Sequence, residues 1–89
     1  MANSTEIIEK DAFSVTAGKV NNSEIGILHF YVFRNNHDGT YTSVNEYYRG
    51  STYTSFWAWA YWVTPQTYTR DDLLERFKDC EFTDKTSPY

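Results

Sequence analysis

The chain has 89 residues, of which 22% are charged and 19% are aromatic, and its net charge is −4. A chain of this length forms one small domain, residues 1–89, with a modest core, because small domains bury a smaller share of their surface. Twelve acids against eight bases give no basic footprint of the kind that neutralises phosphates in nucleic-acid-binding proteins. The charge instead favours another protein with a basic surface as partner, because complementary fields speed encounter.

The sequence also argues against membrane and secreted classes. No apolar run approaches the roughly 20 residues of a membrane helix, and residues 1–25 contain no apolar segment of a signal peptide. Cys80 is the single cysteine, which excludes an intramolecular disulfide scaffold. We therefore expect a cytoplasmic protein without membrane contact.

The first two thirds of the chain predict an antiparallel sheet. For residues 1–11 a helical turn, an edge strand and a mobile arm are all open. Alternating and apolar segments separated by turns then predict a four-stranded meander over residues 12–63. The four expected strands cover residues 12–20, 25–34, 40–48 and 52–63. Gly39 suits the left-handed position of a three-residue loop between the second and third strands.

A helix is expected after the sheet, over residues 69–80. Thr69 suits the N-cap, and Asp71 and Asp72 suit the positive end of the helix dipole. An apolar stripe follows at helical spacing, formed by Leu73, Leu74, Phe77 and Cys80. Residues 81–89 read as a loose tail, with Phe82 free to dock. The predicted class is α+β, a four-stranded antiparallel meander with one C-terminal helix packed on one face, in two layers.

The lengths of the predicted hairpin loops set the cross-strand pairs and thereby assign the side chains to the two faces of this sheet. With three-residue loops at 37–39 and 49–51, the two residues of each cross-strand pair are both even-numbered or both odd-numbered. Paired residues point to the same side, so each side of the sheet collects one of these two sets. One side collects Leu28, Phe30, Val32, Val44, Phe56, Ala58, Ala60 and Trp62. We expect the helix on this side, because the alanines allow close approach. The other, aromatic side collects Ile27, His29, Tyr31, Phe33, Tyr41, Tyr47, Tyr53, Trp57, Trp59 and Tyr61. A two-residue turn at 38–39 would mix the two sets.

The aromatic side is the candidate binding surface. Residues 53–63 contain all three tryptophans, and Tyr and Trp are enriched at the energetic centres of protein interfaces. One helix covers only one face of the sheet. The aromatic side is then covered by residues 1–11, by the tail, by a second copy or by another molecule. The alternative is that these rings form a second small core.

Signatures of catalysis are missing from the sequence. No Gly-rich phosphate loop, paired-cysteine metal motif or nucleophile elbow is present. We expect His29 to pack among tyrosines, His37 to lie in a solvated turn and Cys80 to pack as a small hydrophobe in an acidic setting that raises its pKa. The sequence therefore predicts no enzyme, no cofactor and no metal site.

The first functional hypothesis is a small acidic protein-binding module without catalytic activity. The ten candidate contact residues are Tyr31, Tyr41, Tyr47, Tyr53, Trp57, Trp59, Tyr61, Asp71, Asp72 and Glu75. Dipole complementarity and solubility explain most of the acidic residues of the C-terminal part. The alternative is an acidic ridge that imitates phosphates and is offered to a protein that normally holds DNA or RNA. In size, acidity and lack of chemistry the chain resembles small phage-encoded inhibitors of host nucleic-acid-handling complexes, such as anti-CRISPR proteins. This resemblance is one of composition, and no motif carries it.

Two other functions stay open. Aromatic rings on a sheet stack the bases of single-stranded nucleic acids, although the acidic charge makes such a ligand a poor match. A homodimeric accessory or ligand-binding subunit would use the same aromatic side for self-association.

The aromatic side yields a first testable prediction. If Trp59 anchors a partner, Trp59→Ala costs about 2–4 kcal/mol of binding free energy and leaves unfolding cooperative. Titration calorimetry and urea denaturation of both proteins measure the two quantities. Loss of cooperative folding would instead assign this ring to the core.

Overall fold

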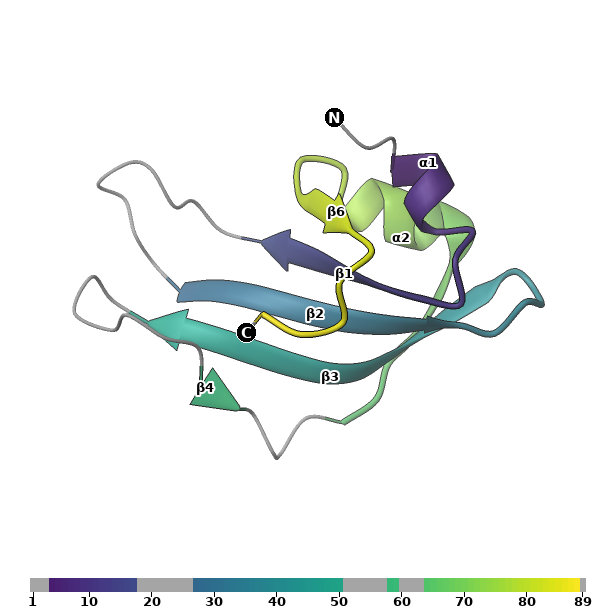
Figure 1. Ribbon diagram of the computed structural model, residues 1–89. Coiled ribbons are helices and arrows are strands. Elements are labelled where there is room, and N and C mark those ends of the chain that lie inside the picture. Colours follow the sequence, from purple (N-terminus) through teal and green to yellow (C-terminus); the bar gives the residue numbers. More distant parts are fainter. Residues whose placement is uncertain (1–3, 18–26, 51–57, 60–63, 89) are drawn as a thin grey trace.

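The computed structural model describes residues 4–17, 27–50, 58–59 and 64–88 of the chain (Figure 1). Within them lie two helices and six strands. In chain order these are α1 (Ser4–Ile7), β1 (Ala12–Ala17), β2 (Ile27–Asn35), β3 (Thr40–Gly50), β4 (Ala58–Trp59), β5 (Thr67–Thr69), α2 (Arg70–Arg76) and β6 (Glu81–Thr83). The fold is α+β, as the sequence predicts.

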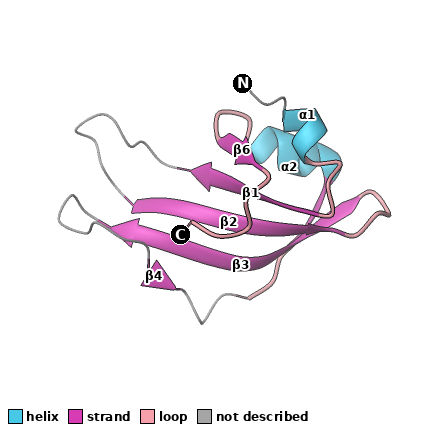
Figure 2. Ribbon diagram, viewed as in Figure 1, coloured by secondary structure: helices cyan, strands magenta, loops and turns pink. Residues whose placement is uncertain are grey.

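All described strands belong to one antiparallel sheet, in the order β4-β3-β2-β1-β6, with β5 also paired to β3 (Figure 2). The sheet therefore contains two short strands in addition to the four that the sequence predicts. β6 adds a strand beside β1, where Val15 pairs with Phe82. β5 adds a short strand beside the start of β3, where Tyr41 pairs with Tyr68. Both short strands come from segments that were expected to lie outside the sheet.

One face of the sheet, here called the helix face, carries the main core. Phe13, Val15, Phe33 and Tyr41 of the sheet pack there against Leu73 and Phe77 of the α2 segment. Ile7 and Ile8 from the α1 segment and Phe82 of β6 complete the cluster. Phe33 lies at its centre, with ring centroids 5.6 Å from Phe13 and 5.6 Å from Phe77. The opposite face, here called the far face, holds a smaller cluster of Phe30, Val32 and Tyr47, with Val44 beside it.

The helix was expected on the wrong face. It packs on the side of Tyr31, Phe33 and Tyr41 rather than on the side of Phe30 and Val32. The cause is the connection, because β5 pairs with the first residues of β3 and leads directly into α2 at Arg70. This places the first turn of α2 at the end of the sheet that carries Tyr41.

A β-bulge in β3 changes the expected face sets. Phe33 pairs with Ser43, which is the predicted register, but Val32 pairs with Asn45, so Val44 is an extra residue on β3. Every position beyond the bulge changes face. Tyr47 consequently joins the far-face cluster with Phe30, to which it is paired, instead of the face of Tyr31.

Both turn and cap predictions are confirmed. The 37–39 loop is closed by the Asn36 amide, which donates to the Thr40 carbonyl at 3.0 Å, and Gly39 has a φ of +90°. Thr69 caps α2, because its hydroxyl accepts from the Asp72 amide at 3.2 Å.

The predicted element ends differ from the observed ones. α2 stops at Arg76 rather than at residue 80, since Phe77 leaves helical geometry with φ −113° and ψ 27°. Of the three alternatives left open for residues 1–11, the structure has the helical turn, α1, and the apolar side chains Ile7 and Ile8 are buried in the core. The expected loose tail begins with β6, which buries Phe82. In both cases apolar side chains dock the segment on the helix face.

The position of Phe33 generates a second prediction. Phe33→Ala removes a fully buried ring and is expected to lower the free energy of unfolding by about 3–5 kcal/mol. Urea denaturation measures the loss. Thr67→Ala, at an exposed position of β5, is the control and should change stability by less than about 0.5 kcal/mol. Similar losses of unfolding free energy for both substitutions would contradict the placement of Phe33 in the core.

Candidate partner-binding surface

The net negative charge is concentrated in two segments. Residues 4–17 and 64–88, which form α1, β1, β5, α2 and β6, carry nine acidic and five basic side chains, whereas the rest of the chain carries three of each. All nine acids are exposed: Glu6, Glu9, Asp11, Asp71, Asp72, Glu75, Asp79, Glu81 and Asp84. We call this set the acidic layer. The net charge of −4 therefore belongs to these two segments of the chain.

α2 exposes Asp71, Asp72 and Glu75 because the opposite side of the helix packs in the core. Leu73 is buried in the core, and Phe77 follows it there. Asp71 and Asp72 lie in the first turn, where the helix dipole favours negative charge. Neither of these two carboxylates forms an ion pair with another described residue. They are thus available to a partner with basic side chains.

Ion pairs connect the acidic layer across the sequence. The Arg70 guanidinium lies 3.1 Å from the Glu9 carboxylate, which joins the start of α2 to the segment after α1. Lys78 lies 3.7 Å from Glu75 on the surface of the same C-terminal segment. Such exposed pairs contribute little stability, so their effect is mainly to orient the carboxylates.

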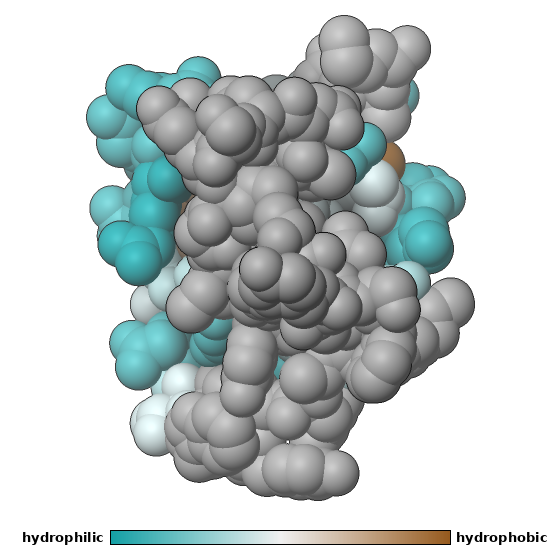
Figure 3. Space-filling view, turned by 90° about the vertical axis from the view of Figure 1, so that its left-hand side faces the viewer, coloured by the Kyte–Doolittle hydropathy of each residue, from teal (hydrophilic) through white to brown (hydrophobic). Residues whose placement is uncertain are grey.

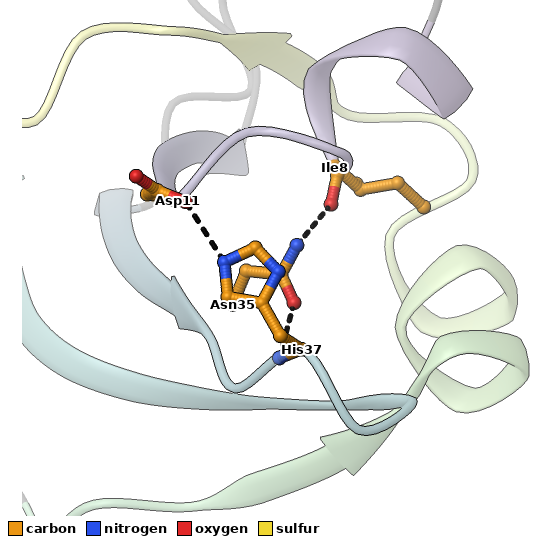
Figure 4. Close-up of polar contacts among 4 residues, drawn as sticks. All are labelled: Ile8, Asp11, Asn35 and His37. Atoms are coloured by element: carbon orange, nitrogen blue, oxygen red, sulfur yellow. Dashed lines mark hydrogen bonds and ion pairs between the residues drawn. The ribbon is translucent and has the colours of Figure 1, made fainter.

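The turn between β2 and β3 is fastened to the segment between α1 and β1 (Figure 4). The Asn35 side-chain amide donates to the Ile8 carbonyl at 3.1 Å, and its oxygen accepts from the His37 backbone N–H at 2.8 Å. The His37 ring lies 2.8 Å from the Asp11 carboxylate. His37 has a φ of +60°, a conformation that is uncommon for residues other than glycine. These contacts hold the first part of the acidic layer against the sheet.

The predicted tyrosine contacts are mostly buried. Tyr41 belongs to the main core and Tyr47 to the far-face cluster, with 4% and 9% of their surfaces exposed. Tyr31 is half-buried beneath the α2 segment, its ring centroid 5.1 Å from that of Phe77. The structure therefore does not bring these three rings together on one exposed surface.

Three of the predicted aromatic contacts, Tyr53, Trp57 and Tyr61, lie outside the described residues. Trp59 is described as part of β4, where it pairs with Tyr47 of β3. The three acids predicted for the site, Asp71, Asp72 and Glu75, are all exposed on α2.

A polar cluster on the helix face was not predicted from the sequence. The Tyr31 hydroxyl and His29 Nδ1 lie 3.1 Å apart, and His29 Nε2 lies 3.7 Å from Glu46. The expectation that His29 packs among tyrosines is confirmed by its edge contact with the Tyr31 ring. Glu46 was missed because the bulge moves it to this face, and no turn residue in the sequence marks a bulge there.

The titratable groups near this cluster are not activated as nucleophiles. Burial, and then the charge of Glu46, raises the pKa of Tyr31 above its ordinary value. Burial, and then the charge of Asp79, raises the pKa of Cys80, as the acidic setting predicts. A high pKa keeps both groups protonated near neutral pH, so neither is a thiolate or phenolate. In the described part of the chain, no three His, Cys, Asp or Glu side chains are placed to hold a metal ion.

Comparisons with known proteins give no family for this chain. A scan of protein-family models finds no match, and searches of curated proteins and of solved structures find none either. Among the described residues, no helix is long and apolar enough to cross a membrane. In the end-on view of Figure 3, the described residues at the surface are mostly hydrophilic.

The burial of Tyr31 generates a third prediction. Because its pKa is raised in the folded protein, Tyr31 contributes stability that is complete below pH 10.0 and is lost as the pH rises through the folded pKa. Tyr31→Phe should therefore make stability less sensitive to pH above 10. Urea denaturation of both proteins between pH 8 and 11 measures this. An unchanged pH dependence would mean that Tyr31 ionises as freely as in the unfolded chain.

The fastened turn generates a fourth prediction. Asn35→Ala removes two side-chain hydrogen bonds and leaves the Ile8 carbonyl without this donor, so it should cost about 1–3 kcal/mol of stability. Asp11→Asn weakens only an exposed pair and should cost no more than about 1 kcal/mol. Chemical denaturation compares the two. A larger loss of stability for Asp11→Asn than for Asn35→Ala would contradict this ranking of the two contacts.

Proposed function

We propose that this chain is a small non-catalytic module that binds another protein through its acidic layer. The observation that carries the proposal is the concentration of the net charge on residues 4–17 and 64–88, with all nine acids exposed. Charge arranged in this way steers association with a basic surface and contributes to specificity.

The way in which the acids are held supports the proposal. The apolar side of α2 is anchored by Leu73 in the core, and the Glu9–Arg70 pair joins α2 to the N-terminal segment. The carboxylates of Asp71 and Asp72 are therefore displayed on a fixed support rather than on a flexible chain. Binding then costs less conformational entropy than the ordering of a disordered acidic segment would.

The partner that fits best is a protein whose basic surface normally holds nucleic acid. Such a surface is built to neutralise regularly spaced phosphates, and exposed carboxylates on a short helix offer it comparable negative charge. The module would act as an inhibitor by occupying that surface. The compositional resemblance to phage-encoded inhibitors such as anti-CRISPR proteins is consistent with this proposal.

Charge-neutralising variants test the proposal. The triple variant Asp71→Asn, Asp72→Asn, Glu75→Gln keeps side-chain size and removes three charges from α2. Immobilised wild-type protein should capture basic proteins from a cell extract at low salt, and capture should fall at least tenfold in the triple variant and at 0.5 M salt, where exposed charges are screened. Mass spectrometry identifies and quantifies the captured proteins.

The matched control keeps the charge and changes the geometry. Asp71→Glu, Asp72→Glu, Glu75→Asp should retain most of the capture if the electrostatic field is what the partner reads. Equal capture by the neutralised and wild-type proteins would contradict the proposal. Salt-sensitive binding of a single-stranded oligonucleotide would favour the nucleic-acid alternative instead.

A further inference from the structure

The turn between β2 and β3 contains a chemically reactive pair of residues that the proposed function does not use. In an Asp-Gly sequence the amide nitrogen of the glycine can attack the side-chain carboxyl of the aspartate, because glycine has no side chain to hinder the approach. Asp38 and Gly39 form such a pair, and both are exposed. A Cβ atom placed on Gly39 would meet no atom within 4 Å beyond its chain neighbours. Crowding by other side chains therefore does not protect this pair.

The reaction loses one water molecule and takes one up again. The Gly39 nitrogen forms a bond to Cγ of Asp38, and a carboxyl oxygen leaves as water with the amide proton and the carboxyl proton, so that a cyclic imide (a succinimide) results. Water then opens the ring at either carbonyl. Breaking the bond between the nitrogen and Cγ restores aspartate. Breaking the bond between the nitrogen and the backbone carbonyl carbon of Asp38 leaves isoaspartate, in which the main chain runs through Cγ.

The carboxyl must be protonated for its oxygen to leave as water, and Thr40 opposes this protonation. Oδ1 of Asp38 accepts from the Thr40 backbone N–H at 3.0 Å and from the Thr40 hydroxyl at 2.5 Å. Hydrogen bonds to the charged form of a carboxyl favour that form. The hydroxyl contact first, and then the backbone contact, hold the pKa of Asp38 below its ordinary value. The side chain is thus kept as a carboxylate, which is a poor target for the Gly39 nitrogen.

The Thr40 hydroxyl is itself oriented by a neighbouring side chain. Its oxygen accepts from Asn36 Nδ2 at 3.0 Å, and its single proton is directed to Asp38. The Asn36 amide also donates to Thr42 Oγ1 at 2.9 Å. These contacts form a chain of hydrogen bonds that runs from Thr42 through Asn36 and Thr40 to the Asp38 carboxylate.

The backbone of the turn is held as well. The Asn36 N–H donates to the Thr40 carbonyl at 3.0 Å, and the Gly39 carbonyl accepts from the Arg70 N–H at 3.2 Å. The second contact joins the turn to the first residue of α2. Ring closure needs rotation of the Asp38 side chain and of the backbone next to Gly39, which would stretch these hydrogen bonds. The closed turn therefore opposes the reaction.

We propose that Asp38–Gly39 is a latent site of isoaspartate formation, which the turn keeps closed through the hydrogen bonds of Thr40. Isoaspartate adds a carbon atom to the main chain between these two residues. The loop geometry that aligns the Gly39 carbonyl with Arg70 would then be lost, so the modification would separate the turn from α2. Asp38 is not part of the acidic layer, and this inference does not rest on the proposed function.

The test compares isoaspartate formation in the folded full-length chain with that in the free peptide 35–49, both at 37 °C and pH 6.0. Cleavage after Arg34 and Arg49 releases the same peptide from the incubated protein. Isomerisation leaves the mass of this peptide unchanged, whereas deamidation of an asparagine raises it, so chromatography with electron-transfer fragmentation identifies isoaspartate at position 38. The rate in the folded protein should be at least tenfold lower than in the peptide, because reaction then requires a local opening of the turn.

Substitutions at two threonines show whether Thr40 provides the protection. Thr40→Val keeps the backbone N–H and the size of the side chain but removes the hydroxyl, and it should raise the rate at least threefold. Thr40→Ser retains a hydroxyl and should stay within about twofold of the wild-type rate. Thr42→Val is the matched control, because it removes the other hydroxyl bonded by Asn36 without touching Asp38, and it should also stay within about twofold.

Urea denaturation establishes that each variant is folded before incubation. If Thr40→Val does not fold, Asn36→Ala replaces it, because this change removes the donor that orients the Thr40 hydroxyl and should also raise the rate. Equal rates in the folded protein and the free peptide would overturn the proposal. So would an unchanged rate in the folded variant with the altered Thr40 contact, or an equal increase for Thr42→Val.

Discussion

The ring contacts around Phe33 hold the two layers of this small protein together. Phe33 contacts Phe13 of the neighbouring strand, Tyr68 of β5 and Phe77 after α2, with ring centroids 5.6 Å apart in each pair. Such pairs contribute about 0.5–1.5 kcal/mol each beyond the area they bury. Because these partners come from three segments and Phe33 itself belongs to a fourth, one buried side chain connects distant parts of the chain.

The bulge at Val44 determines what each face presents. It leaves Phe33 under the helix but turns Tyr47 to the far face and Glu46 toward His29. The far face thereby gains an apolar cluster that the helices do not reach. Thr86 of the C-terminal segment lines the same surface hollow as Val32 and Val44 of that cluster.

The net negative charge belongs to the two ends of the chain. The acids gather on the layer formed by the two ends of the chain, and their supports are the buried residues Leu73 and Ile8 together with the Glu9–Arg70 pair. A surface hollow beside Val32 and Val44 of the far-face cluster is lined by Arg34 and by Asp11 of the acidic layer. The pKa values of Tyr31 and Cys80 are raised, so both side chains stay protonated near neutral pH.

Local signals in the sequence were sufficient for the fold class, the turn at Gly39 and the cap at Thr69, because each depends on the conformational preference of one or two residues. The exposed acids of α2 were equally predictable from helical spacing. The face on which the helix packs was not, since it follows from the pairing of β5 with β3, two segments far apart in the chain. The positions of Tyr47 and Glu46 depend on a bulge that exchanges faces by a single extra residue. Composition and spacing therefore predicted the longer strands and the helix, and only tertiary packing decided that β5 and β6 joined the sheet and which of the tyrosines became core.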